Sequence, residues 1–139
     1  MQIVDGYAII SIFIIAFCLL WALPQRFFVE EGLNMIAIKY AVVIVTHNRE
    51  HLLRECIDNV KNQTIAPNSI IVVNNASTDG TKKYLEDERK QNEIIDIIDL
   101  PQNIGGAGGF SKGIERALEK KIDCILIIDD DAMINKDYM

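Results

Sequence analysis

Residues that bind metals through nitrogen or sulfur are scarce in this chain. Its 139 residues include two histidines and three cysteines, and Cys18, Cys56 and Cys124 lie far apart in apolar surroundings. No CxxC pair and no His/Cys spacing indicates a zinc site. We interpret the cysteines as small buried hydrophobic residues of a protein from a reducing compartment.

The chain also lacks a positively charged stripe. It has 14 Lys and Arg against 20 Asp and Glu, and its formal net charge is −6. Because proteins that bind nucleic acids need clustered positive charge, this composition argues against a nucleic-acid partner. An acidic protein that binds an acidic ligand needs a metal ion or backbone N–H groups to hold it.

Familiar nucleotide and calcium motifs are missing as well. Four glycines stand within residues 105–109, but they fit neither G-x-G-x-x-G nor the P-loop, which ends in Gly-Lys-Ser/Thr. Asp129 begins no calcium loop, because Ile134 occupies the position that requires glycine. His47 and His51 have no metal-binding spacing to the carboxylates, and we expect His47 to be structural.

The N-terminal region contains an apolar stretch of 17 residues, Tyr7–Leu23, with one polar residue among them. This length is near the lower limit for a membrane-spanning helix. No Lys or Arg precedes the stretch, and Arg26 and Lys39 follow it. We therefore expect residues 1–34 to be a transmembrane segment and linker that leave the rest of the chain at the cytoplasmic face of the membrane.

A second interpretation of the N-terminal region stays open. Glu30-Glu31-Gly32 can be encoded by a purine-rich string that resembles a bacterial ribosome-binding site, a few nucleotides before Met35. Residues 1–34 would then lie outside the natural protein, which would be cytoplasmic. In both interpretations the organised domain is 35–139.

Strand and helix patterns alternate from residue 36 onward. We predict strands at 40–46, 70–73, 94–100 and 124–128, and helices at 50–63, 81–90 and 109–121. This alternation predicts βαβ units in an α/β fold, with an open, mostly parallel Rossmann-like sheet and flanking helices.

The predicted helices carry apolar residues at helical spacing. We expect these side chains to be buried: Leu53, Cys56, Ile57, Val60, Tyr84, Leu85, Phe110, Ile114, Ala117 and Leu118. Asn48 is predicted to cap the helix that follows it. Gly113 costs a helix roughly 1 kcal/mol relative to Ala, which suggests that another element packs closely there.

The predicted strand 124–128 ends in three consecutive carboxylates, Asp129, Asp130 and Asp131. Its continuous apolar run is typical of a strand buried on both faces of a parallel sheet. Adjacent like charges repel, and a divalent cation such as Mg²⁺ or Mn²⁺, which also binds phosphate oxygens, relieves that repulsion. The run therefore indicates a metal-assisted site for a phosphorylated ligand. The alternative is a solvated acidic turn that caps the next helix.

Polar residues follow every predicted strand, at 46–49, 74–81, 103–109 and 129–131. In open α/β sheets, ligands bind outside the carboxyl ends of the strands, so these four segments predict one ligand crevice. Ordinary caps and turns use the same residue types, and this alternative stays open for each segment taken alone.

The ordered motifs resemble those of family 2 glycosyltransferases, which have the GT-A fold. The resemblance covers residues 37–139 and is carried by Val43–Arg49, Ile71–Thr81, Asn103–Phe110 and Ile128–Asp131. The glycine segment and the triple Asp look most like the galactofuranosyltransferase and rhamnosyltransferase branches.

This resemblance implies roles for particular residues. Thr46, Asn48 and Arg49 would border the nucleotide base and phosphates, and Asn74 stands where the family usually has an Asp that contacts uracil. Asp129 and Asp131 would hold the metal, Mn²⁺ or Mg²⁺. The other implied nucleotide-sugar-binding residues are Asn75, Asp79, Asn103, Gly105, Gly106, Gly108, Asp129 and Asp130.

The resemblance also implies a reaction and its partners. A sugar would pass from a UDP- or dTDP-linked donor to a glycan or lipid-linked acceptor of the cell surface, with inversion at the anomeric carbon. We expect the general base beyond Met139, and therefore no sugar transfer by these 139 residues alone. We also expect self-association through an exposed sheet edge.

Three rival interpretations remain. The chain could be a module that binds nucleotide sugar without transferring it, or a membrane-anchored interaction protein without chemistry. A nucleotidyltransferase is less favoured, because the segment 46–49 has one Arg and no Gly to grip a triphosphate.

Overall fold

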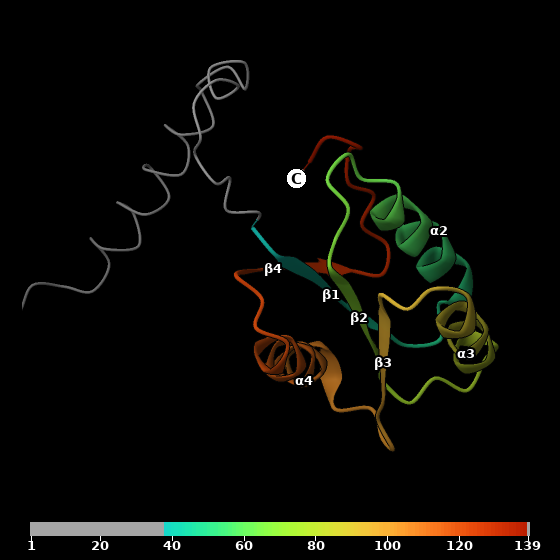
Figure 1. Ribbon diagram of the computed structural model, residues 1–139. Helices are drawn as coiled ribbons and strands as arrows, with labels where there is room; N and C mark the ends of the chain where they lie inside the picture. The colour runs from blue at the N-terminus through green and yellow to red at the C-terminus, as the bar shows by residue number, and fades with distance from the viewer. Residues whose placement is uncertain (1–37, 139) are drawn as a thin grey trace, which may run out of the picture. The chain divides into compact units, whose positions relative to one another are not determined.

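The computed structural model describes residues 38–138 and shows a parallel four-stranded sheet of order β3-β2-β1-β4 (Figure 1). The strands are β1 (Tyr40–Thr46), β2 (Ser69–Asn74), β3 (Ile95–Asp99) and β4 (Cys124–Asp129). The helices are α2 (Glu50–Lys61), α3 (Thr81–Gln91) and α4 (Gly105–Glu119). Strands and helices alternate along the chain, as the sequence predicts.

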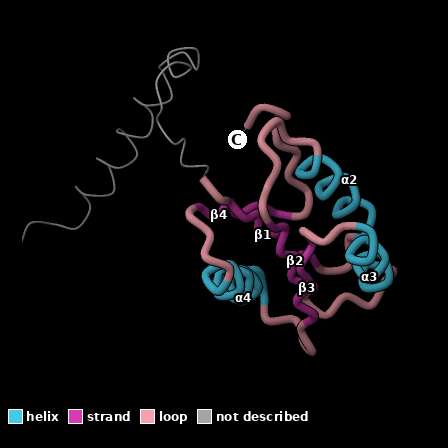
Figure 2. Tube along the Cα trace, in the orientation of Figure 1, coloured by secondary structure: helices cyan, strands magenta, loops and turns pink. Residues whose placement is uncertain are grey.

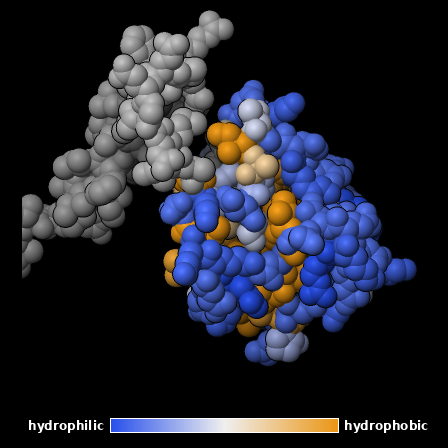
Figure 3. All heavy atoms as spheres, viewed as in Figure 1, coloured by the Kyte–Doolittle hydropathy of each residue, from blue (hydrophilic) through white to orange (hydrophobic). Residues whose placement is uncertain are grey.

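Helices cover both faces of the sheet (Figure 2). Because successive strand residues point to opposite faces, Val42 and Ile44 of β1 join the core beneath α2 and α3, whereas Ala41 and Val43 join the core beneath α4. Figure 3 shows the apolar residues in a band between two hydrophilic helix layers. The fold is therefore the predicted α/β sheet with flanking helices.

The predicted buried faces of the first two helices are confirmed. Leu53, Cys56, Ile57 and Val60 of α2 and Tyr84 and Leu85 of α3 are all buried. The prediction for Gly113 is also confirmed, because a Cβ there would lie 2.2 Å from Val43 Cγ1. This glycine lets α4 approach the middle of the sheet.

The third helix differs from its prediction in the residue at which it begins and in the side chains that it buries. It begins at Gly105, not near residue 109, so the glycine segment forms the first turns of α4. Asparagine side chains from outside the helix hold its first N–H groups, and these contacts offset the low helix propensity of glycine. Leu118 is 67% exposed rather than buried, whereas Ala117 is buried as expected.

Three further predictions are wrong. Strand β4 is not buried on both faces, because it lies at an edge of the described sheet, where Ile127 is 46% exposed. Cys124, on the same strand, is exposed rather than buried. Asn48 does not cap α2: the N-cap residue is Arg49, and Asn48 has a left-handed φ of 55°.

The predicted membrane segment Tyr7–Leu23, the linker, Cys18 and the alternative start at Met35 lie outside the described residues. Within residues 38–138, every helix is too short or too polar to cross a bilayer.

Candidate functional site

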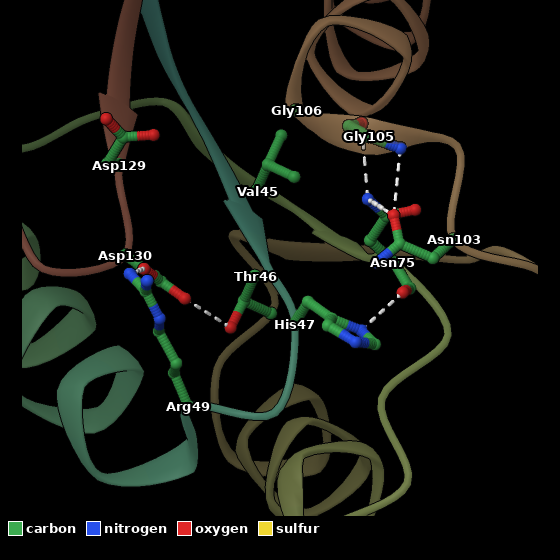
Figure 4. A pocket seen from close by; sticks show the side chains of 10 residues that line it. All are labelled: Val45, Thr46, His47, Arg49, Asn75, Asn103, Gly105, Gly106, Asp129 and Asp130. Carbon is green, nitrogen blue, oxygen red and sulfur yellow. Dashed lines mark hydrogen bonds and ion pairs between the residues drawn. The ribbon is translucent and has the colours of Figure 1, made fainter.

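A pocket of about 270 Å³ opens at the carboxyl ends of β1, β2 and β4, beside the first turn of α4 (Figure 4). This is the edge where the sequence predicts a crevice. The pocket is lined by Val45, Thr46, His47, Arg49, Asn75, Asn103, Gly105, Gly106, Asp129 and Asp130. Eight of these ten residues are predicted site residues; Val45 and His47 are the additions.

One wall of the pocket joins the end of β1 to the acidic turn after β4. Thr46 Oγ1 donates a hydrogen bond of 2.7 Å to Asp130 Oδ2, and Arg49 Nη1 lies 3.2 Å from Asp130 Oδ1. The same Nη1 lies 3.3 Å from Asp131 Oδ2. Asp130 is buried, with an exposed fraction of 4%, whereas Asp129 is exposed. The three carboxylates therefore have different surroundings although they are adjacent in sequence.

The opposite wall is the N-terminus of α4. Asn75 Oδ1 accepts a hydrogen bond from the Ile104 N–H at 2.9 Å, and Asn103 Oδ1 accepts one from the Gly105 N–H at 2.8 Å. A helix leaves four N–H groups without intrahelical partners. After these two bonds, the N–H groups of Gly106 and Ala107 remain for a ligand. The positive end of the helix dipole also favours an anion here.

His47 is a pocket residue that the sequence interpretation treated as structural. Its Nδ1–H donates to the Asn75 carbonyl oxygen at 2.8 Å, and its Nε2 accepts from Asn48 Nδ2 at 3.3 Å. Its ring thus holds the β1 loop to the β2 loop while it lines the pocket. Its place directly after β1, among other polar residues, is the signal that could have marked it.

Three predicted residues make contacts within the protein beside the pocket. Asn48 Oδ1 accepts the Thr78 N–H at 2.7 Å, which ties the loop after β1 to the loop after β2. Both polar atoms of the Asn74 amide bond to other residues of the protein, and the side chain is buried. Asp79 accepts hydrogen bonds from the backbone N–H groups of Glu50 and Thr81, the first residues of α2 and α3.

Two other predicted residues, Gly108 and Asp131, are not among the pocket-lining residues. A Cβ at Gly108 would lie 2.9 Å from Ile104 Cδ1, so this glycine leaves room for the residue before the helix. The Asp131 side chain is 54% exposed and pairs with Arg49.

The residues around the acidic turn fit a divalent cation that arrives with phosphate. Within the described residues, no group of three or more His, Cys, Asp or Glu side chains is placed to hold a metal alone. Mg²⁺ and similar ions often use one or two carboxylates together with substrate phosphates. Of the three carboxylates of the turn, those of Asp130 and Asp131 pair with the Arg49 guanidinium. Among the described residues, no hydrogen bond or ion pair involves the Asp129 carboxylate. The turn thus has oxygen ligands and an excess of negative charge.

The acidic turn also acts on the residue behind it. The buried Cys56 Sγ lies 3.6 Å from the Asp129 carbonyl oxygen. Burial and the nearby charges of Asp130 and Asp131 raise the pKa of the Cys56 thiol to about 12. The thiol is therefore protonated at neutral pH and unreactive, and it supports the turn by donating to the carbonyl.

The family model for Glycosyl transferase family 2 matches residues 41–139, which include the whole pocket. The chain belongs to this family. Galactofuranosyltransferase GlfT1 of Mycolicibacterium smegmatis is 37% identical over 89 residues, 64% of this chain and 28% of that protein. Poly(ribitol-phosphate) beta-glucosyltransferase of Bacillus spizizenii is 31% identical over 104 residues, 73% of this chain and 16% of that protein.

A solved structure is also similar to a large part of this chain. TarS 1-349 from S. aureus, in complex with UDP, is 29% identical, with a TM-score of 0.58. The match covers 72% of this chain and 29% of the TarS chain. This chain thus spans less than a third of the length of these three proteins.

Proposed function

We propose that this chain binds the donor of a glycosyltransferase reaction, in which a sugar passes from a nucleoside diphosphate to a hydroxyl of a glycan or lipid-linked acceptor. One observation carries the proposal. One pocket at the carboxyl edge of a parallel sheet is bordered by three kinds of group: the free N–H groups of α4, the Arg49 guanidinium and the Asp129 carboxylate.

Each wall of the pocket suits one part of such a donor. The N–H groups of Gly106 and Ala107 and the guanidinium of Arg49 are donors for diphosphate oxygens. The loops after β1 and β2, which Asn48 ties together, would border the base. The UDP complex of the S. aureus protein supports a uridine nucleotide as the probe to test first.

A divalent cation, Mn²⁺ or Mg²⁺, would be held by Asp129 and Asp131 together with the donor diphosphate. When bound, it would neutralise negative charge on the departing nucleoside diphosphate. Asp129 lines the pocket, and the 54% exposed side chain of Asp131 pairs with the pocket residue Arg49, so both carboxylates are accessible from solvent.

The rest of the reaction is proposed from the family. The acceptor hydroxyl would lose its proton to a carboxylate base, and the anomeric carbon would invert. Because nucleotide sugars are made in the cytoplasm, we propose that the site faces the cytoplasm, either free or at the membrane through residues 7–23. Assembly of a cell-surface glycan is the setting that this acceptor class suggests.

Titration calorimetry on the full chain with UDP tests the proposal. We expect weak binding in EDTA and clearly tighter binding with Mn²⁺, because the cation neutralises both the acidic turn and the diphosphate. Asp129→Asn and Asp131→Asn should each lose most of the gain from Mn²⁺. Asp87→Asn, an exposed change on α3, is the matched control and should bind like the wild type. Absence of UDP binding with and without Mn²⁺ would refute the proposal.

A further inference from the structure

Asp130 differs from its two acidic neighbours in being enclosed by protein. Its side chain is 5% exposed, against 54% for Asp131. Each carboxylate oxygen has its own protein partner: Thr46 Oγ1 donates to Oδ2, and Arg49 Nη1 donates to Oδ1. Thr46 is itself buried, with an exposed fraction of 1%. A buried charge with two good hydrogen bonds holds its partners firmly.

Arg49 needs such a partner, because little else fixes its side chain. It is the N-cap residue of α2, and its side chain is 52% exposed. Its contact with the exposed Asp131 is the kind of surface ion pair that solvent and salt weaken. Only Nη1 bonds to described residues. The Nε and Nη2 donors are therefore available, and Arg49 lines the pocket.

We propose that Asp130 is a positioning residue: it holds the Arg49 guanidinium in the pocket so that its free N–H groups meet the donor diphosphate. On this view Asp130 contacts neither the nucleotide nor the metal, unlike Asp129. Thr46 completes the arrangement by fixing the other carboxylate oxygen and joining the end of β1 to the turn after β4. This inference rests on the proposed function, since it assumes a diphosphate in the pocket.

The planar guanidinium explains why positioning matters here. Arginine binds phosphate through two parallel N–H bonds, which requires a fixed orientation of the plane. An arginine held by one edge against a buried carboxylate keeps the other edge aligned for this contact. Asp130 would then strengthen binding of the diphosphate and leave binding of the nucleoside unchanged.

A double-mutant cycle tests the inference by measuring UDP and uridine affinity of the full chain. The variants are Asp130→Asn, Arg49→Ala and the double variant, measured in EDTA and in Mn²⁺, with Asp87→Asn as the control. We expect Asp130→Asn to weaken UDP binding roughly tenfold in both conditions, as for loss of one charge-assisted hydrogen bond. Uridine binding should not change, and Asp130→Asn should have no further effect when Arg49 is already Ala.

Several results would overturn the inference while leaving UDP binding by the wild type intact. One is that Asp130→Asn still weakens UDP binding when Arg49 is already Ala. Another is that Asp130→Asn weakens UDP binding only with Mn²⁺. The third is that Asp130→Asn weakens uridine binding as much as UDP binding. If the wild type binds no UDP, the proposed function fails and the inference fails with it.

If Asp130→Asn does not fold, Thr46→Val and Thr46→Ser test the inference in its place. Thr46→Val should weaken UDP but not uridine binding, and Thr46→Ser should retain both; UDP binding by Thr46→Val at the wild-type level would overturn the inference.

Discussion

Asn74 Nδ2 donates a hydrogen bond of 2.8 Å to Asp99 Oδ1 across the ends of neighbouring parallel strands. The other amide atom, Asn74 Oδ1, accepts the Ser77 N–H at 3.1 Å. Only a side chain with both a donor and an acceptor satisfies these two partners. This explains why Asn stands where the family resemblance leads one to expect Asp: an Asp at this position would face the carboxylate of Asp99.

We therefore predict that Asn74→Asp destabilises the protein by about 1–3 kcal/mol near neutral pH, because it replaces a buried hydrogen bond with two facing carboxylates. Their repulsion raises the pKa of one carboxyl in the folded state, so the folded state binds more protons than the unfolded state and stability falls as pH rises. Urea unfolding at neutral and at acidic pH measures the free energy of unfolding of both proteins. The stability that the variant lacks relative to the wild type should be smaller at acidic pH.

The double variant Asn74→Asp/Asp99→Asn is the control for this pair. It restores a donor opposite an acceptor and should recover most of the lost stability. A deficit in Asn74→Asp that is the same at both pH values, and that Asp99→Asn does not relieve, would contradict the explanation.

A second prediction concerns Asp79, whose carboxylate accepts from the N–H groups that begin α2 and α3. Burial alone would raise its pKa, but hydrogen bonds from Thr81 and from the Glu50 backbone outweigh burial and lower the pKa below its ordinary value of 3.8. Asp79→Ala should cost about 1 kcal/mol, as for loss of a helix cap.

The pH dependence of the Asp79 contribution follows from the lowered pKa. The stabilisation is fully present above the unfolded-state pKa and is lost as pH falls through the folded-state value. Thermal unfolding of wild type and Asp79→Ala should therefore converge at strongly acidic pH. Glu86→Ala, an exposed change on α3, should leave the melting temperature almost unchanged at every pH. Equal stability of Asp79→Ala and wild type at neutral pH would refute the capping role.

The strands and most helix bounds could be predicted because they follow from local apolar patterns. The buried residues Leu53 and Val60 of α2 repeat at helical spacing, and residues 41–45 of β1 form one continuous apolar run. The position of the pocket was also predictable, since parallel strands bring their carboxyl ends to one edge.

The start of α4 was not predictable, because distant side chains decide it. Gly105 and Gly106 are poor helix formers, and the helix begins there because Asn75, from the end of β2, and Asn103 hold its first N–H groups. The individual roles of Asp129, Asp130 and Asp131 were hidden for the same reason. Three identical residues give no sequence signal for which one is buried; the neighbours Thr46 and Arg49 make Asp130 the enclosed carboxylate.

A third prediction concerns the end of α4. Lys121 follows the C-cap residue Lys120 and has a left-handed φ of 53°. This conformation costs a non-glycine residue roughly 1–2 kcal/mol, and glycine is the usual residue there. Lys121→Gly should stabilise the protein by about 0.5–1 kcal/mol, after the added freedom of the unfolded chain is subtracted.

Lys121→Ala is the matched control, because it removes the same side chain and keeps the Cβ that causes the strain. Its stability should stay near that of the wild type, and only the glycine variant should gain. Chemical unfolding of the three proteins compares them directly. An equal gain in both variants would assign the effect to the lysine side chain rather than to the backbone.

The last prediction concerns the glycines that let α4 lie against the sheet. A Cβ at Gly113 would be 2.2 Å from Val43 Cγ1 and 3.3 Å from Val73 Cγ2, and Val43 is a buried residue of the core beneath α4. Gly113→Ala should therefore destabilise the protein by about 1–3 kcal/mol, although alanine is the better helix former. Gly106→Ala, in the first turn of the same helix, places its methyl group where no atom lies within 4 Å. This control should hold or raise stability, because the helix gains propensity without a clash. Urea unfolding measures the change in stability of each variant. Close packing of α4 against β1 predicts changes of opposite sign for Gly113→Ala and Gly106→Ala. A gain in stability in both variants would mean that α4 can move away from the sheet at little cost.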